Sequence, residues 1–172
     1  NMSISSVDGA HDGTSMLCRV MSALSGPGKI CVVSAGNDGN VPTCLHKQFN
    51  GALDTLSVLL SNKYGGRNVD GYVSMWSADS VPHALRVIVT DVATGTLLYA
   101  SPFYSALPGD SVVEVADATD LQFAKYFTGS FRVAPAIESN GKFHSIVEYN
   151  ANNLQQDYVM GLQYVSAPGS RL

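Results

Sequence analysis

The sequence predicts a mainly β protein, in which an antiparallel β-sandwich follows a short segment with an α/β pattern. Two observations lead to this class. From about residue 51 onward apolar and polar residues alternate, which is the period of strands with one buried face. Turn signals separate these stretches at intervals of roughly 8 to 14 residues, as in sandwiches and barrels. Residues 1–45 lack this alternation of apolar and polar residues and are predicted to form a separate unit. The sandwich is therefore assigned to residues 46–172.

The first 45 residues predict a strand, a helix and a second strand. Residues 1–5 (NMSIS) are short and half apolar, as in a strand. Residues 29–35 (KICVVSA) form a continuous apolar run, which is typical of a parallel strand covered on both faces. Between them, four apolar residues recur at the spacing of one helix face: Leu17, Val20, Met21 and Leu24.

The ends of this helix carry ordinary signals. Asp12, Thr14 or Ser15 can cap its first turn, and Gly26 followed by Pro27 ends it. A strand-helix-strand (βαβ) unit needs a parallel sheet, and two strands are too few to bury both faces of one. We therefore expect the chain to be an internal fragment of a longer protein.

Eight strands are predicted for the second part of the chain. In residues 85–90 (LRVIVT) every second side chain, beginning with Leu85, is expected in the core. Asn140-Gly141 is the strongest hairpin signal. We interpret the set as two antiparallel sheets in a jelly-roll-like sandwich, while residues 117–125 are predicted to be a short helix or a loop. The predicted strands are 53–60, 71–77, 85–92, 96–101, 111–115, 130–136, 143–150 and 158–165.

Composition excludes several classes of partner. The formal charge is -4 and no basic run occurs, so neither nucleic acid nor an anionic membrane surface is predicted to bind. No apolar stretch approaches the roughly 18 residues of a membrane span. Cys18, Cys31 and Cys44 lack the spacing of zinc ligands and are predicted to be buried small hydrophobic residues, so no metal site is expected.

Asn37 ends the apolar run in residues 32–39 (VVSAGNDG). An asparagine that follows a glycine at a strand end commonly makes a turn or caps a helix. A carboxamide N–H at the rim of a sheet can also donate to the oxygen that becomes negative during acyl transfer. The residues alone leave both interpretations open.

The motifs around Asn37 resemble those of the subtilisin-like serine proteases. NMSIS (1–5) is similar to that family's Asn-Met-Ser-Leu-Gly-Gly strand, and VVSAGNDG (32–39) is similar to its Val-Val-Ala-Ala-Gly-Asn-Glu-Gly motif, in the family's order. GAHDGTS (9–15) narrows the resemblance to the branch of the spore-germination proteases, whose members carry an inserted jelly-roll domain. The resemblance spans the chain, with specific motifs in about the first 40 residues.

This resemblance implies a serine endopeptidase that hydrolyses peptide bonds in peptide or protein substrates. The partners it implies are the substrate and the rest of the subtilase domain. It makes calcium a candidate ligand of the parent protease, implies no other cofactor, and suggests a secreted or cell-envelope protein of bacteria. Asn37 would be the oxyanion-hole donor. The pocket for the residue before the scissile bond would be lined by Ser34, Ala35 and Gly36, and the substrate main chain would pair with Ser3, Ile4 and Ser5.

The family's catalytic Asp, His and Ser lie outside this segment, so the chain alone is predicted to be inactive as a protease. Ser15 and His11 lie in HDGTSM (11–16), which mimics two of the missing motifs. Ser15 precedes the predicted oxyanion strand, however, and is interpreted as a helix-start residue. His11 is separated from Gly13 by Asp12 and is interpreted as a loop histidine.

The other histidines, His46, His83 and His144, lack the spacing of metal ligands and are expected to be polar residues of strands or of the surface. Ser5 and Ser6 stand where the family has glycine, which predicts a narrower substrate groove.

Two alternatives are open. The first is a carbohydrate- or protein-binding jelly-roll module, which would display Tyr72, Trp76 and Tyr99 as a stripe on one exposed face. Trp76 is otherwise predicted to lie in the core. The second is a pseudoprotease scaffold, in which the subtilase frame persists without turnover.

Overall fold

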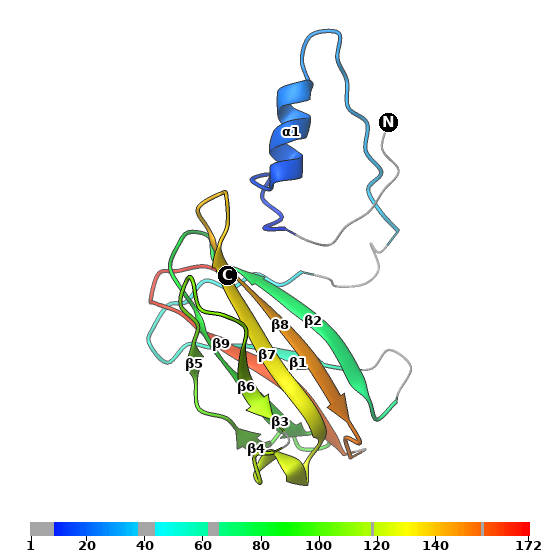
Figure 1. The fold of residues 1–172 in the computed structure, drawn as a ribbon, viewed down its shortest axis with the longest axis vertical. Coiled ribbons are helices and arrows are strands. Elements are labelled where there is room, and N and C mark those ends of the chain that lie inside the picture. Colours follow the sequence, from blue (N-terminus) through cyan, green and yellow to red (C-terminus); the bar gives the residue numbers. More distant parts are fainter. Residues whose placement is uncertain (1–8, 38–43, 62–65, 118, 156) are drawn as a thin grey trace.

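A computed structural model describes residues 9–37, 44–61, 66–117, 119–155 and 157–172 (Figure 1). The described part is mainly β, as predicted, and its sandwich lies beside a single α-helix. The helices are α1 (Met16–Leu24) and the 3-10 turn η1 (Phe123–Lys125). The strands are β1 (Leu56–Leu60), β2 (Val69–Trp76), β3 (Ala84–Asp91), β4 (Leu97–Ala100), β5 (Tyr104–Ser105), β6 (Val113–Asp117), β7 (Thr128–Ile137), β8 (Phe143–Asn152) and β9 (Tyr158–Val165).

The strands form two antiparallel sheets. One has the order β1-β9-β3-β4, and β5 also pairs with β3; the other has the order β2-β8-β7-β6. β7 and β8 form the longest hairpin, in register from Thr128 opposite Asn152 to Ile137 opposite Phe143. Its turn contains the predicted Asn140-Gly141, where Gly141 has the positive φ of 79° that glycine adopts without strain.

The two sheets enclose one hydrophobic core, to which both contribute fully buried side chains. On β3, Leu85, Val87 and Val89 are 0% exposed, as the alternation predicted for 85–90 expects, but Ile88 on the other face is also buried, at 4% exposed. Burying each such side chain contributes about 1.5–3 kcal/mol relative to exposure. On β7, Phe131 is 0% exposed and its ring contacts those of Phe127 and Tyr149.

Phe123 in η1 is also inserted into this core. Its ring lies 4.5 Å from that of Tyr99 on β4 and 5.2 Å from that of Phe127, both edge-on. The region 117–125, predicted as helix or loop, is thus anchored by one aromatic side chain. All eight predicted strands are present; β5, which has only two residues, was missed because so short a strand has no periodicity to detect.

Helix α1 forms where the sequence predicts it. Ser15 is its N-cap, and its Oγ accepts from the Cys18 N–H at 3.3 Å. Ser25 is the C-cap, and Gly26 pairs with Lys29 across the turn that follows. The helix and the segment around it lie beyond one end of the sandwich (Figure 1).

Residues 29–35 differ from their prediction. They form no strand, only single bridges at Lys29 and Val33, and each of them is exposed. The apolar side chains of Ile30 and Val32 stay in solvent because no sheet of the described residues covers them. The predicted strand at 1–5 lies outside the described residues. The burial predicted for the cysteines is also wrong, since Cys31 and Cys44 are exposed and Cys18 is only partly buried.

Two polar contacts join this segment to the sandwich. The Lys142 ammonium pairs with the Asp12 carboxylate, and the Asn140 amide donates to Thr14 Oγ1 at 3.0 Å. Both partners on the sandwich belong to the turn between β7 and β8. Within the described ranges, no helix has the length and apolar character needed to cross a membrane.

Candidate functional site

Residues 34–37 lie exposed at the end of the segment that follows α1. Gly36 has a φ of 86°, in the left-handed region that favours glycine, and it turns the backbone immediately before Asn37. The extended run therefore ends at Gly36, and Asn37 follows it as an exposed bend residue. The predicted pocket residues Ser34 and Ala35 are exposed too, whereas Ser3, Ile4 and Ser5 lie outside the described residues.

The residues that mimic catalytic motifs occupy ordinary structural positions. Ser15 caps α1 through its Oγ, which confirms its interpretation as a helix-start residue. His11 lies in the loop before α1 with a φ of 50°. The carboxylate of Asp12 accepts from Lys142 and from Thr14, and these contacts lower the pKa of that carboxyl strongly, the Lys142 hydrogen bond most. Asp12 is therefore ionised at neutral pH and holds the loop against the sandwich.

The apolar side of this segment is uncovered. α1 is amphipathic, yet no residue of it is buried. Leu17 is 52% exposed and Ile30 is 87% exposed. A helix and an extended run with this pattern normally pack against a sheet, which means that residues 9–37 lack their packing partner among the described residues.

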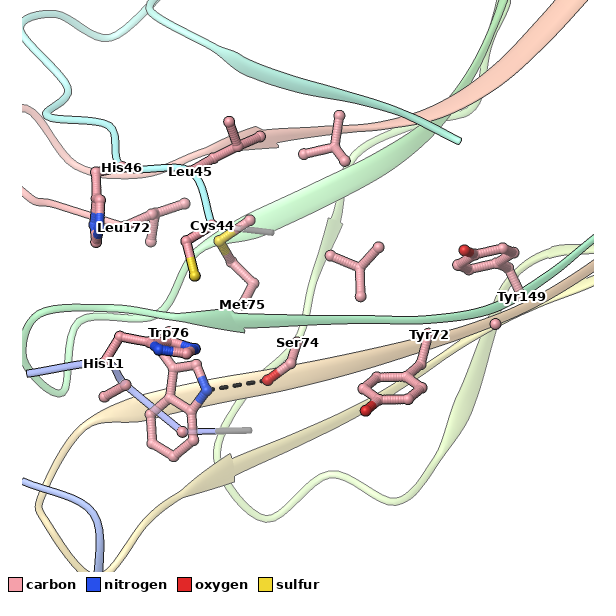
Figure 2. Close-up of a pocket in the computed structure, with 15 residues that line it drawn as sticks. His11, Cys44, Leu45, His46, Tyr72, Ser74, Met75, Trp76, Tyr149 and Leu172 are labelled. Atoms are coloured by element: carbon pink, nitrogen blue, oxygen red, sulfur yellow. Dashed lines mark hydrogen bonds between the residues drawn. The ribbon is translucent and has the colours of Figure 1, made fainter. Parts of the chain in front are cut away.

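A groove of about 550 Å³ lies beside β2 at the open edge of its sheet (Figure 2). Among the described residues β2 pairs with β8 alone, so its other edge borders the groove. Apolar side chains come from the inner face of β2 and from β1, namely Val73, Met75 and Val58. The outer face of β2 contributes Tyr72, Ser74 and Trp76, and a short stretch of chain, Cys44, Leu45 and His46, crosses the opposite side.

Trp76 lies on the outer face of its sheet, so its predicted place in the core is wrong. Its indole stacks on the imidazole of His144 with ring centroids 4.0 Å apart. Its Nε1–H donates to Ser74 Oγ at 3.0 Å (Figure 2). Tyr72 is 51% exposed on the same face, whereas Tyr99 packs in the core against Phe123. The aromatic stripe predicted for a binding module is therefore not formed.

A second histidine lies between the sheets. His83 is buried; its Nδ1 lies 3.1 Å from Ser77 Oγ and its Nε2 lies 2.6 Å from Ser145 Oγ. Burial, with a smaller repulsion from His144, lowers the pKa of His83 to about 3. His83 is therefore neutral at physiological pH and joins the strands through two serine hydroxyls. Both histidines were expected as simple polar residues. The sequence gives no signal for either network, because the contact of His83 with Ser145 spans 62 positions and that of His144 with Ser74 spans 70.

Across the described residues no three His, Cys, Asp or Glu side chains are grouped so that they could hold a metal ion. No family model, curated protein or solved structure matches the chain. The functional argument therefore depends on the motifs of the sequence and on the geometry given above.

Proposed function

We propose that the chain is part of a subtilisin-like serine endopeptidase. Residues 9–37 belong to its catalytic domain, and the sandwich is an inserted domain with a structural or regulatory role. The observation that carries the proposal is the position of Asn37, which is exposed immediately after the left-handed Gly36 at the end of an apolar run. In the proposed protease residues 29–35 would pair into the catalytic sheet, and a carboxamide directly after them would reach a substrate carbonyl at the rim of that sheet.

The uncovered apolar surface of residues 9–37 supports the same proposal. Leu17 and Ile30 are large apolar side chains in solvent, and other apolar residues of α1 and of 29–35 are exposed as well. Exposed apolar residues in such number favour a surface that another part of the protein covers. In the proposed protease the missing strands of the catalytic sheet would pack against α1 and against residues 29–35. The segment is incomplete because the sheet that it belongs to is supplied by other parts of the protein.

In the proposed reaction a serine outside these 172 residues attacks the peptide carbonyl. The carbonyl oxygen becomes negative, and the Asn37 side-chain N–H donates to it, which lowers the barrier to the tetrahedral intermediate. Ser34, Ala35 and Gly36 line the pocket for the residue before the scissile bond. Ser3, Ile4 and Ser5 pair with the substrate main chain as an added strand.

The test uses the protein extended to the natural ends of its reading frame. For Asn37→Ala we expect kcat on a peptide substrate to fall about 10² to 10³-fold, the size known for the matching asparagine of subtilisin, with little change in KM. Asn50→Ala, which removes another exposed carboxamide, is the matched control and should retain full activity. An Asn37→Ala variant as active as the wild type would contradict the role of Asn37.

A binding module is the second candidate, and the groove beside β2 is the observation that favours it. Its volume of about 550 Å³ is in the range of small-molecule sites, and aromatic side chains line one side of it. If the extended protein reacts with no serine probe and cleaves no peptide, a binding module or a pseudoprotease scaffold becomes the better description.

A further inference from the structure

Three side chains on the outer face of the β2-β8-β7-β6 sheet form a continuous hydrogen-bonded chain. Ser74 Oγ on β2 lies 2.9 Å from His144 Nε2 on β8. The other ring nitrogen of His144, Nδ1, lies 3.0 Å from Glu138 Oε1 in the turn between β7 and β8. The register that places Trp76 opposite His144 brings the three together. Serine, histidine and carboxylate at these distances are the geometric signature of an activated nucleophile.

The direction of each hydrogen bond follows from the chemistry of its partners. A carboxylate can only accept, so in the contact with Glu138 the proton lies on Nδ1 of His144. In the neutral imidazole Nε2 is then an acceptor, so the Ser74 hydroxyl donates to it. The Trp76 indole can only donate, and it donates to the remaining lone pairs of Ser74 Oγ. The hydroxyl proton thus points at a base, which a carboxylate holds in the required tautomer.

The positions of the three groups relative to solvent suit the same chemistry. Ser74 and Trp76 line the groove beside β2, while His144 and Glu138 lie behind them and do not line it. His144 is 7% exposed, so its ring is shielded, whereas the Glu138 side chain is 40% exposed. A carbonyl carbon in the groove could approach Ser74 Oγ.

The contacts of His83 differ from those of His144 in two respects, the absence of a carboxylate partner and the distance from the groove. His83 also contacts serine hydroxyls, on both ring nitrogens, but neither contact is to a carboxylate. It is buried and its lowered pKa makes it a poor proton acceptor at neutral pH. Neither Ser77 nor Ser145 lines the groove beside β2, so the His83 network holds strands together.

We propose that Ser74, His144 and Glu138 form a second nucleophilic site, which transfers the acyl group of a small carboxylic ester bound in the groove beside β2. Ser74 Oγ is the nucleophile, His144 Nε2 is the base, and Glu138 is a positioning residue. The volume of the groove suits a small ester, and Tyr72 and Trp76 line it on the same face of β2 as Ser74. The three reacting side chains all belong to the sandwich, so the proposal does not depend on the proposed protease function, although Gly9, Ala10 and His11 of the segment before α1 also line the groove.

The reaction balances as an ester hydrolysis. Ser74 Oγ forms a bond to the carbonyl carbon as its proton passes to His144 Nε2. The bond from carbon to the alkoxy oxygen then breaks, and the same proton leaves with the alcohol. Water attacks the acyl-serine, gives a proton to Nε2, and releases the carboxylic acid as that proton returns to Ser74. The sum is ester and water converted to acid and alcohol, without any redox step.

The test uses the 172-residue chain, which lacks the nucleophile of the proposed protease. The chain is treated with a fluorophosphonate probe, the adduct is mapped by peptide mass spectrometry, and p-nitrophenyl acetate hydrolysis is measured in parallel. We expect the adduct on Ser74. Ser74→Ala and His144→Gln should lower the rate of labelling by about 10²-fold or more. Ser57→Ala is the matched control, since Ser57 lies on the edge strand β1 and bonds Gln163 instead of a histidine.

Glu138→Gln tests the positioning role. It keeps a group that can bond Nδ1 but removes the charge, so we expect the labelling rate to fall about 10²-fold without a change in melting temperature, and Glu138→Asp to restore part of it. The melting temperature, followed by far-ultraviolet circular dichroism, reports whether each variant keeps its fold, because Trp76 contacts Ser74 and His144 directly and its fluorescence would change with either substitution. An adduct on another serine, or no adduct on the folded wild type, overturns the proposal even where a variant fails to fold.

Discussion

Residues 9–37 and the sandwich differ in what becomes of their apolar side chains. The amphipathic helix α1 has a well-formed N-cap and a clear apolar face, yet it buries no residue. The long strands of the sandwich are less apolar than α1, but the two sheets face each other, so that Leu85 and Phe131 are 0% exposed. The comparison teaches that an apolar pattern determines which element forms, but only a partner within reach determines whether that element is buried.

The first test of this difference compares how much stability is lost when a large side chain is removed from each part. Phe131→Ala should lower the free energy of unfolding by about 3–5 kcal/mol, because it leaves a cavity between Phe127 and Tyr149. Leu17→Ala, on exposed α1, should change it by less than about 0.5 kcal/mol. Urea denaturation of both variants measures the difference. Equal losses would mean that α1 is covered in solution.

The second test measures how the stability of the protein depends on pH, and it concerns His83 of the sandwich. The pKa of His83 is about 3 in the folded protein, below its ordinary value of 6.5, so the unfolded state binds the proton first as pH falls. The contribution of His83 is present above pH 6.5 and is lost progressively as pH falls from 6.5 toward 3. We expect a loss on the order of a few kcal/mol.

The matched variant for this test is His83→Gln, which keeps hydrogen-bonding capacity without a titrating group. Thermal melts between about pH 6.5 and 4.5 are informative, because most carboxylates do not yet titrate there. The wild type should lose stability across this window and His83→Gln should lose less. Parallel curves for the two proteins would show that His83 is not the group responsible.

The smallest expected effect concerns the contacts between the two parts. Lys142→Met removes the ion pair with Asp12, and Asn140→Ala removes the hydrogen bond to Thr14. Partly exposed pairs of this kind contribute less than about 1 kcal/mol, so the sandwich should keep its stability. The loop before α1 should become more mobile, which faster limited proteolysis within residues 9–37 would reveal. An unchanged cleavage rate would mean that other contacts hold the segment.

Much of the fold could be predicted from the sequence. The alternation at 85–90 and the turn at Asn140-Gly141 are local signals, and they gave the right class, the eight longer strands and the hairpin. The helix boundaries followed from the capping serine and from the Gly26-Pro27 pair. The strand predicted at 29–35 was not formed, because a run of apolar residues becomes a strand only when a neighbour pairs with it.

Of the two candidate sites, one could be recognised from the sequence and the other only from the structure. Asn37 could be identified from the sequence, because its motif consists of residues that are neighbours in the chain. Its role in catalysis is still a prediction. The hydrogen-bonded series of Ser74, His144 and Glu138 could not be identified from the sequence. Ser74 and His144 are 70 residues apart, and they meet only through the pairing of β2 with β8. Trp76 was assigned to the core for the same reason: a period of two shows that a strand has two faces and does not show which one is inside.

The sequence by itself determined the mainly β class, the helix with its caps, and the motif that ends on Asn37. Each of these depends on interactions between residues close together in the chain, which propensity and periodicity describe. The tertiary structure alone decided which face of β2 is solvent-exposed, which histidine is buried between the sheets, and which serine meets a histidine and a carboxylate. Those outcomes depend on strand order and register, which are set by the packing of the whole core rather than by any local segment.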